Sequence, residues 1–201
     1  MTSSSTSTLQ TLLSSFSAFN DLSPDTLQWL ATHSKPYHCS VGQSLLVSDR
    51  LPEFCYCVVE GRGRVLHHDP GLRRPVTLAY SQPGDLIGWA GLARRSPCEW
   101  ITAATPLKLI GFPARVFYEL ESNSSSFRYW LDSNNSPAEI MSILSYSLRS
   151  RPTGEPQERE VMRRLVHHFK MHPLRDQRVL PDHSEELFLW NAQIDDFSLP
   201  V

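Results

Sequence analysis

The sequence lacks several features that would place it in a simple functional class. It has no run of eighteen or more apolar residues, which excludes a membrane-spanning helix within the chain. It also has no excess of basic residues, because 19 Lys and Arg stand against 21 Asp and Glu, with a net charge of -2. A protein that wraps nucleic acid would usually be basic on at least one face, so we expect no strong nucleic-acid binding.

Cysteine is scarce, and motifs of known enzyme chemistry are absent from the sequence. The four cysteines show no spacing of a disulfide framework, and the N-terminus has no secretory signal, so we expect reduced thiols and a cytoplasmic protein. The sequence contains no nucleophile elbow, P-loop, His-Glu-x-x-His motif or paired-carboxylate spacing. An enzyme would have to use Cys98 with an unplaced histidine, and we therefore predict that the chain is not an enzyme.

What the sequence does contain is a change of hydrophobic period. Two helices are predicted near the N-terminus, the second with Ser23 as N-cap, and residues 36–112 then alternate with a period of two between turn signals. This pattern predicts an antiparallel jelly roll or β-barrel of about eight short strands with helices before and after it. We expect strands at 37–39, 44–47, 54–59, 64–67, 74–80, 100–105 and 107–112, and Gly61 at positive φ.

Helical signals return after the strands. A helix is predicted over 113–120, then a polar break at 122–126, then a helix from Ser136 to Ser150 that begins with a capping box and carries Ile140, Ile143, Leu144 and Leu148 on one stripe. A further helix over 157–170 and a short strand over 187–190 follow two prolines. We divide the chain into a disordered leader (1–8), one domain (9–151) and a C-terminal helical extension with a short strand (152–201).

The stretch from Pro83 to Thr105 is the candidate functional site. It has a turn at its start, small residues at 88–91 that can begin a short helix, and a second turn at Ser96-Pro97. Backbone N–H groups in such a loop can converge on an anion, which predicts a phosphate cradle. The candidate ligand-binding residues are Gly88, Trp89, Ala90, Gly91, Leu92, Arg94, Arg95, Pro97 and Cys98.

This stretch resembles the phosphate-binding cassette of the cyclic-nucleotide-binding domain family. The family cassette reads approximately Phe-Gly-Glu-x-Ala-Leu and, a few residues later, Pro-Arg. Gly88 stands at the family's glycine, Gly91-Leu92 at its Ala-Leu, and Pro97 at its proline. The resemblance covers about residues 9–151, because the order of glycine landmarks, strands and flanking helices also follows the family's layout.

The cassette departs from the family at the two residues that grip the nucleotide. Trp89 stands where the resemblance implies a glutamate for the ribose hydroxyl, and Cys98 where it implies an arginine for the cyclic phosphate. Loss of hydrogen bonds to a charged group costs about 1.5–3 kcal/mol each, so the resemblance implies the fold without ordinary cyclic AMP binding. An alternative is that Arg94 and Arg95 supply the missing charge.

The resemblance implies a non-enzymatic sensor or regulatory domain with a degenerate pocket, in which the helix Ser136–Ser150 moves against the barrel or pairs with a second copy. The cofactor is not certain, and a nucleotide-like or other small ligand is possible. The partner is expected to be another domain or protein, such as a bacterial peptide-exporting ABC transporter with a peptidase domain, which the sequence resembles around Pro97-Cys98-Glu99-Trp100. The alternative is a catabolite-activator-type transcription regulator with a reduced or absent DNA-binding part.

Four smaller patterns each allow two interpretations. Cys98 is either an activated thiolate or a pocket-lining residue, and Cys55 with Cys57 is either half of a metal site with His67 and His68 or a pair of buried structural thiols. Trp89 and Trp100 can stack on a flat ligand or fill the pocket. The histidines at 167, 168 and 172 can bind metal or form a solvated helix end. We expect structural thiols and a solvated helix end, and leave the tryptophan pair open.

Overall fold

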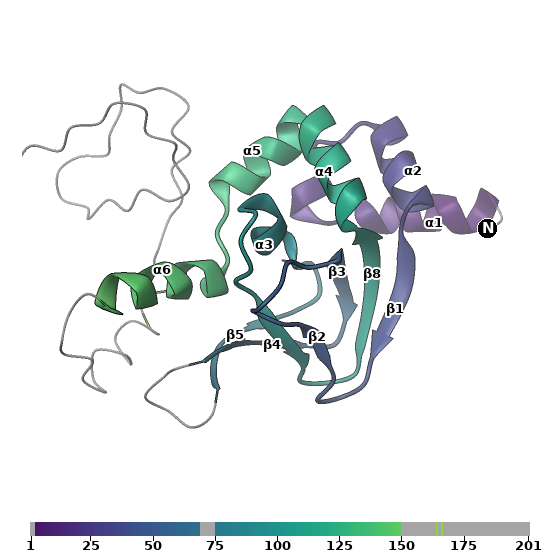
Figure 1. The fold of residues 1–201 in the computed structure, drawn as a ribbon. Helices are drawn as coiled ribbons and strands as arrows, with labels where there is room; N and C mark the ends of the chain where they lie inside the picture. Colours follow the sequence, from purple (N-terminus) through teal and green to yellow (C-terminus); the bar gives the residue numbers. More distant parts are fainter. Residues whose placement is uncertain (1–2, 69–74, 150–163, 165, 167–201) are drawn as a thin grey trace, which may run out of the picture.

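The β strands form two antiparallel four-stranded sheets that lie face to face (Figure 1). The computed structural model describes residues 3–68, 75–149, 164 and 166. The first sheet has the strand order β1-β8-β3-β6 and the second has the order β2-β7-β4-β5. The strands are β1 (Lys35–Cys39), β2 (Ser44–Leu46), β3 (Phe54–Glu60), β4 (Gly63–His67), β5 (Val76–Ser81), β6 (Leu86–Ile87), β7 (Trp100–Ala103) and β8 (Leu107–Pro113). The predicted jelly roll of short antiparallel strands is thus confirmed, with β6 as a strand that the period did not reveal.

The first sheet is buried on both faces at its inner strands β3 and β8. Successive residues of β3 face opposite sides, so that Cys55 and Cys57 belong to one hydrophobic cluster while Tyr56 and Val58 belong to another. We call the former the helical cluster, because helices cover that face, and the latter the barrel cluster, because it lies between the two sheets. Burial on both faces explains why β3 reads as a nearly continuous apolar run.

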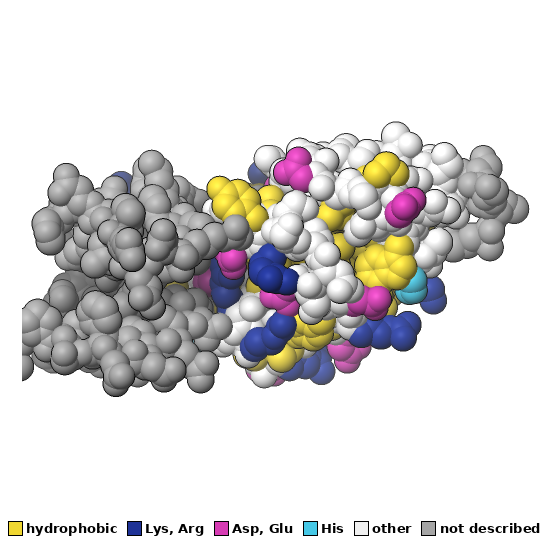
Figure 2. Space-filling view, turned by 90° about the horizontal axis from the view of Figure 1, so that it is seen from above, with side chains coloured by type: hydrophobic (Ala, Val, Ile, Leu, Met, Phe, Trp, Pro, Cys, Tyr) yellow, Lys and Arg dark blue, Asp and Glu magenta, His cyan; other side chains and the backbone are white. Residues whose placement is uncertain are grey.

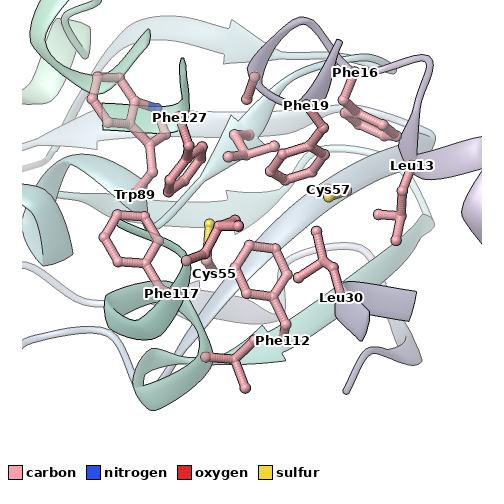
Figure 3. Packing of buried hydrophobic residues seen from close by; sticks show 14 of the residues in the cluster. Leu13, Phe16, Phe19, Leu30, Cys55, Cys57, Trp89, Phe112, Phe117 and Phe127 are labelled. Carbon is pink, nitrogen blue, oxygen red and sulfur yellow. The ribbon is translucent and has the colours of Figure 1, made fainter. Parts of the chain in front are cut away.

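Helices α1 (Ser3–Leu13), α2 (Pro24–Thr32), α4 (Ala114–Asn123) and α5 (Ser125–Ser133), with the 3-10 turn Ser17–Phe19, cover the outer face of the first sheet. Phe19 lies at the centre of the helical cluster (Figure 3), with its ring centroid 6.1 Å from that of Phe112 and 5.9 Å from that of Phe127. Ser23 caps α2 as predicted, since its Oγ accepts a hydrogen bond from the N–H of Thr26.

The structure differs from the predicted disordered leader over residues 1–8, because α1 begins at Ser3. The helix is held against α2, where the side-chain amide of Gln10 donates to the carbonyl of Pro24 at 3.0 Å. Thr11 donates to the carbonyl of Ser7 at 3.1 Å. Once the apolar residues further along have formed the first turns, adding helical residues towards the N-terminus costs little, so a polar Ser/Thr composition does not prevent the helix.

The polar break predicted at 122–126 is shorter than expected, and a helix follows it. Helix α4 continues to Asn123, and the side chain of Ser124 then accepts a hydrogen bond from the N–H of Phe127 at 3.1 Å and caps α5. Phe127 and Leu131, four residues apart on α5, are fully buried in the helical cluster. The serines therefore mark a helix start instead of a loop.

Helix α6 (Pro137–Arg149) confirms the helix predicted from Ser136 to Ser150 and its capping box. The N–H of Ser136 donates to Glu139 at 3.4 Å, and the N–H of Ala138 donates to the hydroxyl of Ser136 at 3.3 Å. Ile140 and Met141 are buried in the barrel cluster, and Ile143 packs against it. The start of α6 therefore closes the barrel on the side of β4 and β5.

Much of the predicted C-terminal extension lies outside the described residues, including the helix over 157–170 apart from Arg164 and Val166, the strand over 187–190 and the three histidines. Val166 is buried in the barrel cluster. Among the helices that the structure describes, none has the length and hydropathy of a membrane span.

Substitution of two glycines should separate backbone strain from close packing. Gly61 and Gly42 have φ of 90° and 79°, but a Cβ on Gly61 would lie 2.0 Å from the carbonyl oxygen of Pro106, whereas one on Gly42 meets nothing within 4 Å. Both alanine variants carry a left-handed backbone cost of about 1–2 kcal/mol. Gly61→Ala should lose at least about 2 kcal/mol more free energy of unfolding than Gly42→Ala in urea titrations. Equal losses would contradict this packing.

Candidate functional site

The candidate cassette has the local geometry that its turns predict. Gly84 adopts a φ of 100°, and the carboxylate of Asp85 accepts a hydrogen bond from the N–H of Gln82 at 2.8 Å. After β6, Gly88 takes a left-handed φ of 83° and opens the short helix α3 (Trp89–Ala93). A Cβ on Gly88 would lie 2.8 Å from the carbonyl oxygen of Phe54, so glycine is required for the chain to pass this close to β3.

The N–H groups at the start of α3 converge on a carboxylate of the chain itself. Glu99, 4 % exposed, accepts hydrogen bonds from the N–H groups of Gly88 at 3.2 Å and Gly91 at 3.3 Å. The N–H of Ala90 also interacts with it. The convergence that the turns predict is therefore present, and its anionic partner is an internal side chain.

Burial is the main influence on the acidity of Glu99. Desolvation raises the pKa of its carboxyl group, the hydrogen bonds from Gly91 and Gly88 lower it, and the nearby Glu139 carboxylate raises it, with a net pKa of about 7. The amides of α3 thus offset only part of the cost of burying this charge. Glu99 is poised to exchange a proton near neutral pH.

Arg94 connects the cassette to the helices that follow the barrel. Its Nε donates to Glu139 at 2.6 Å, and its guanidinium also donates to the carbonyl of Leu131 at 3.1 Å and that of Asn134 at 3.0 Å. The side chains of Arg94 and Glu139 are 11 % and 1 % exposed, so this ion pair is buried. A single side chain at the end of α3 therefore contacts α5, the following linker and α6.

Arg95 points to a different helix. It is the one described residue other than glycine with a positive φ, 54°, and its guanidinium donates to Glu121 of α4 at 2.7 Å and lies 3.9 Å from the ring centroid of Tyr118. On the helical face, basic and acidic side chains are interspersed (Figure 2). The structure thus pairs both Arg94 and Arg95 with carboxylates of the helices, and it does not bring either to the α3 amides as a second phosphate ligand.

The other predicted site residues divide between core and surface. Ala90, Gly91 and Leu92 are buried, Pro97 is exposed and Cys98 is partly buried. Trp89 lies in the helical cluster with its ring centroid 5.1 Å from that of Trp130, whereas Trp100 on β7 is partly exposed. Trp89 therefore fills core space in the helical cluster.

The structure places Cys98, Cys55 and Cys57 in surroundings that disfavour a thiolate. Burial raises the pKa of the Cys98 thiol well above its usual range, the carboxylates of Glu99 and Glu139 raise it further, and Arg94 lowers it less. An activated thiolate at Cys98 is therefore contradicted. Cys55 and Cys57 face the same side, as their spacing predicts, and both are fully buried in the helical cluster, where burial raises their pKa values.

Sequence reasoning missed the two carboxylates that organise this site. Glu99 is two residues before Ile101 and four before Ala103, which face the barrel cluster, so the period of β7 already placed its side chain on a buried side. Glu139 was recognised as part of a capping box, but its partner Arg94 lies 45 residues away, and no local pattern links them. The signal in the sequence that could have revealed this site was the acidic residue Glu99, at a position that the strand period places on a buried side.

Comparison with solved structures identifies the class of fold. A scan against protein-family models and a search of curated proteins each found no match. The solved structures that resemble this chain include a kinase regulatory domain with cAMP and the sensor domain of a transcriptional regulator, and the chain has the mixed fold of an antiparallel jelly roll with flanking helices.

Three particular structures illustrate the likeness. The regulatory domain of Toxoplasma gondii PKA with cAMP matches with a TM-score of 0.57 and 19 % identity over 63 % of this chain and 48 % of that chain. The sensor domain of the transcriptional regulator DNR from Pseudomonas aeruginosa gives 0.56 and 18 % over 75 % and 97 %. The regulatory subunit of a cAMP-independent protein kinase A from Trypanosoma cruzi, bound to guanosine, gives 0.55 and 16 % over 72 % and 50 %. This chain thus spans about half the length of the two kinase structures.

The acidity of Glu99 should govern how stability depends on pH. Its folded pKa of about 7 exceeds the ordinary value of 4.5, so its contribution to stability is complete below pH 4.5 and is lost as the pH rises through 7. The loss is roughly 3 kcal/mol, and Glu99→Gln should remove it from urea titrations between pH 5 and 8. Glu60→Gln, at a carboxylate that is 64 % exposed, is the control and should keep the wild-type slope. The same slope in Glu99→Gln would contradict the assignment.

Proposed function

We propose that this chain is a non-enzymatic regulatory or sensor module whose cassette is degenerate and does not take up cyclic nucleotides. The fold supports the first part, because the similar structures are a kinase regulatory domain and a transcriptional sensor domain. The observation that carries the second part is the position of the Glu99 carboxylate on the N–H groups of Gly88 and Gly91.

The internal carboxylate competes with a phosphate for the same donors. A nucleotide phosphate at these N–H groups would have to displace Glu99 or approach its negative charge, and two unit charges 4 Å apart repel by roughly 4 kcal/mol at an effective dielectric constant of about 20. In addition, Trp89 and Cys98 stand at the positions where the family resemblance implies the ribose-binding glutamate and the phosphate-binding arginine. All three features weaken nucleotide binding.

The alternative of a true cyclic-nucleotide binder that uses Arg94 or Arg95 has less support. Arg94 would have to leave a buried ion pair with Glu139, and breaking such a pair by removing one partner costs about 3–5 kcal/mol. Arg95 would have to leave both Glu121 and the face of Tyr118. Both side chains are already used to fix α3 against the helices.

The identity of the regulated partner is also part of the proposal. We propose that the module controls an attached or partner protein, with a peptide-exporting ABC transporter as the first candidate, and that α6 is the element that transmits the signal or pairs with a second copy. The likeness to the DNR sensor domain favours the transcription regulator as the second candidate. Co-purification with the transporter and gel-shift of random duplex at low salt would separate the two.

Cyclic-nucleotide titration tests the degenerate cassette. In calorimetry, wild type should bind neither cyclic AMP nor cyclic GMP at concentrations of about 1 mM, because the donors are occupied and the arginine is missing. The double variant Cys98→Arg/Glu99→Ser should gain at least tenfold in affinity over either single variant, since the guanidinium then has an unoccupied cradle beside it.

The single variants Cys98→Arg and Glu99→Ser are the matched controls, each of which restores only one condition. Micromolar binding of a cyclic nucleotide to wild type would overturn the proposal while leaving the fold assignment intact. Binding to Glu99→Ser no weaker than to the double variant would show that occupancy of the cradle, and not the missing arginine, limits affinity.

A further inference from the structure

Three charged side chains from different segments meet in the buried region between the cassette and α6. Arg94 follows α3, Glu99 precedes β7 and Glu139 belongs to the first turn of α6. Glu99 and Glu139 are 4 % and 1 % exposed and interact electrostatically. The cluster therefore contains two buried carboxyl groups and one guanidinium.

The guanidinium of Arg94 forms an ion pair with one of these carboxyl groups, that of Glu139. It binds Glu139 at 2.6 Å, while Glu99 accepts hydrogen bonds from backbone N–H groups at the start of α3. When both carboxyl groups are ionised, the buried cluster carries a net charge of -1. When one of them holds a proton, the cluster is neutral.

The same cluster is the polar attachment of α6 to the cassette. Arg94 binds Glu139 of α6 and the carbonyl of Asn134 in the linker before it, so a change in the charge balance acts directly on the start of α6. Ile140 and Met141, which directly follow Glu139, lie in the barrel cluster. Release of Glu139 would therefore also loosen the apolar contact that closes the barrel.

We propose that the signal read by this module is a proton: protonation of Glu99 holds α6 docked through the Arg94–Glu139 pair, and ionisation of Glu99 weakens that docking. The inference rests on the proposed function, because a proton can act as the signal only if the cradle is held by Glu99 and not by a nucleotide.

The two thiols that interact with Glu99 do not change charge in the same range. Cys98 next to it and Cys55 of β3 interact with it electrostatically, and burial raises the pKa of both thiols, so they stay neutral. Glu139 of α6 is paired with Arg94. Glu99, with its pKa of about 7, gains or loses a proton near neutrality.

The direction of the effect follows from linkage. In the undocked form the repulsion from Glu139 disappears, and this change lowers the pKa of Glu99. The docked form thus binds the proton more tightly, and acid favours docking. If the undocked carboxyl titrates as an exposed glutamate does, the docking constant falls about tenfold from pH 6 to pH 8.

Hydrogen exchange of the full chain tests this switch. Backbone amides of residues 136–143, corrected for the intrinsic pH dependence of exchange, should be about tenfold less protected at pH 8 than at pH 6. Glu99→Gln, which cannot ionise, should keep the protection of pH 6 at both values. Glu139→Gln, which removes the partner of Arg94, should lower protection at both. Glu60→Gln, in an exposed ion pair with Lys108, should behave as wild type.

A second measurement does not depend on the variants folding. The carboxyl carbon of Glu99 in wild type, followed by NMR, should titrate with a midpoint near neutral pH. A midpoint near 4.5, or protection of residues 136–143 that is equal at pH 6 and pH 8 in wild type, would overturn the inference.

Calorimetry with cyclic AMP at both pH values keeps the two proposals apart. Micromolar binding would end the proposed function and with it the premise of a proton signal. Absence of binding together with pH-independent protection would end only the inference of a proton switch.

Discussion

The structure of the cassette depends on a single buried contact, that of the Glu99 carboxylate with the N–H groups at the start of α3. Those N–H groups have no partners within their own short helix, and leaving them unpaired in the interior would cost about 1–3 kcal/mol each. The carboxylate satisfies them and in return is buried at the cost of a raised pKa. Gly88, in its left-handed conformation, supplies one of these N–H groups.

Adjacent arginines divide the attachment of α3 between two parts of the helical layer. Arg94 contacts α5, the linker and α6, whereas Arg95 contacts α4. Arg95, the second of the two, has a left-handed φ of 54°. Through these contacts, the cassette is connected to α6 by a buried ion pair and to α4 by a more exposed one.

The sequence predicts most of the fold and less of the site. The period of two, the turn residues and the N-caps at Ser23 and Ser136 are local signals, and they place the strands and helices correctly. Helix α5 was not predicted, because its N-cap, Ser124, lies within a run of serines that is typical of a loop. The pairing of Arg94 with Glu139 was not predicted, because the two residues are 45 positions apart and meet only in the folded chain. Likewise, the family resemblance drew attention to Cys98, while the decisive side chain is its neighbour Glu99.

The double burial of the first sheet has a consequence for its thiols. Cys55 and Cys57 are sealed between helices and strands, with no exposed surface at all. An alkylating reagent can reach these sulfur atoms only when the helical layer lifts away from β3, whereas a reagent meets Cys98 nearer to the surface. The rate at which the two buried sulfur atoms are alkylated therefore reports how often the helical layer opens away from β3.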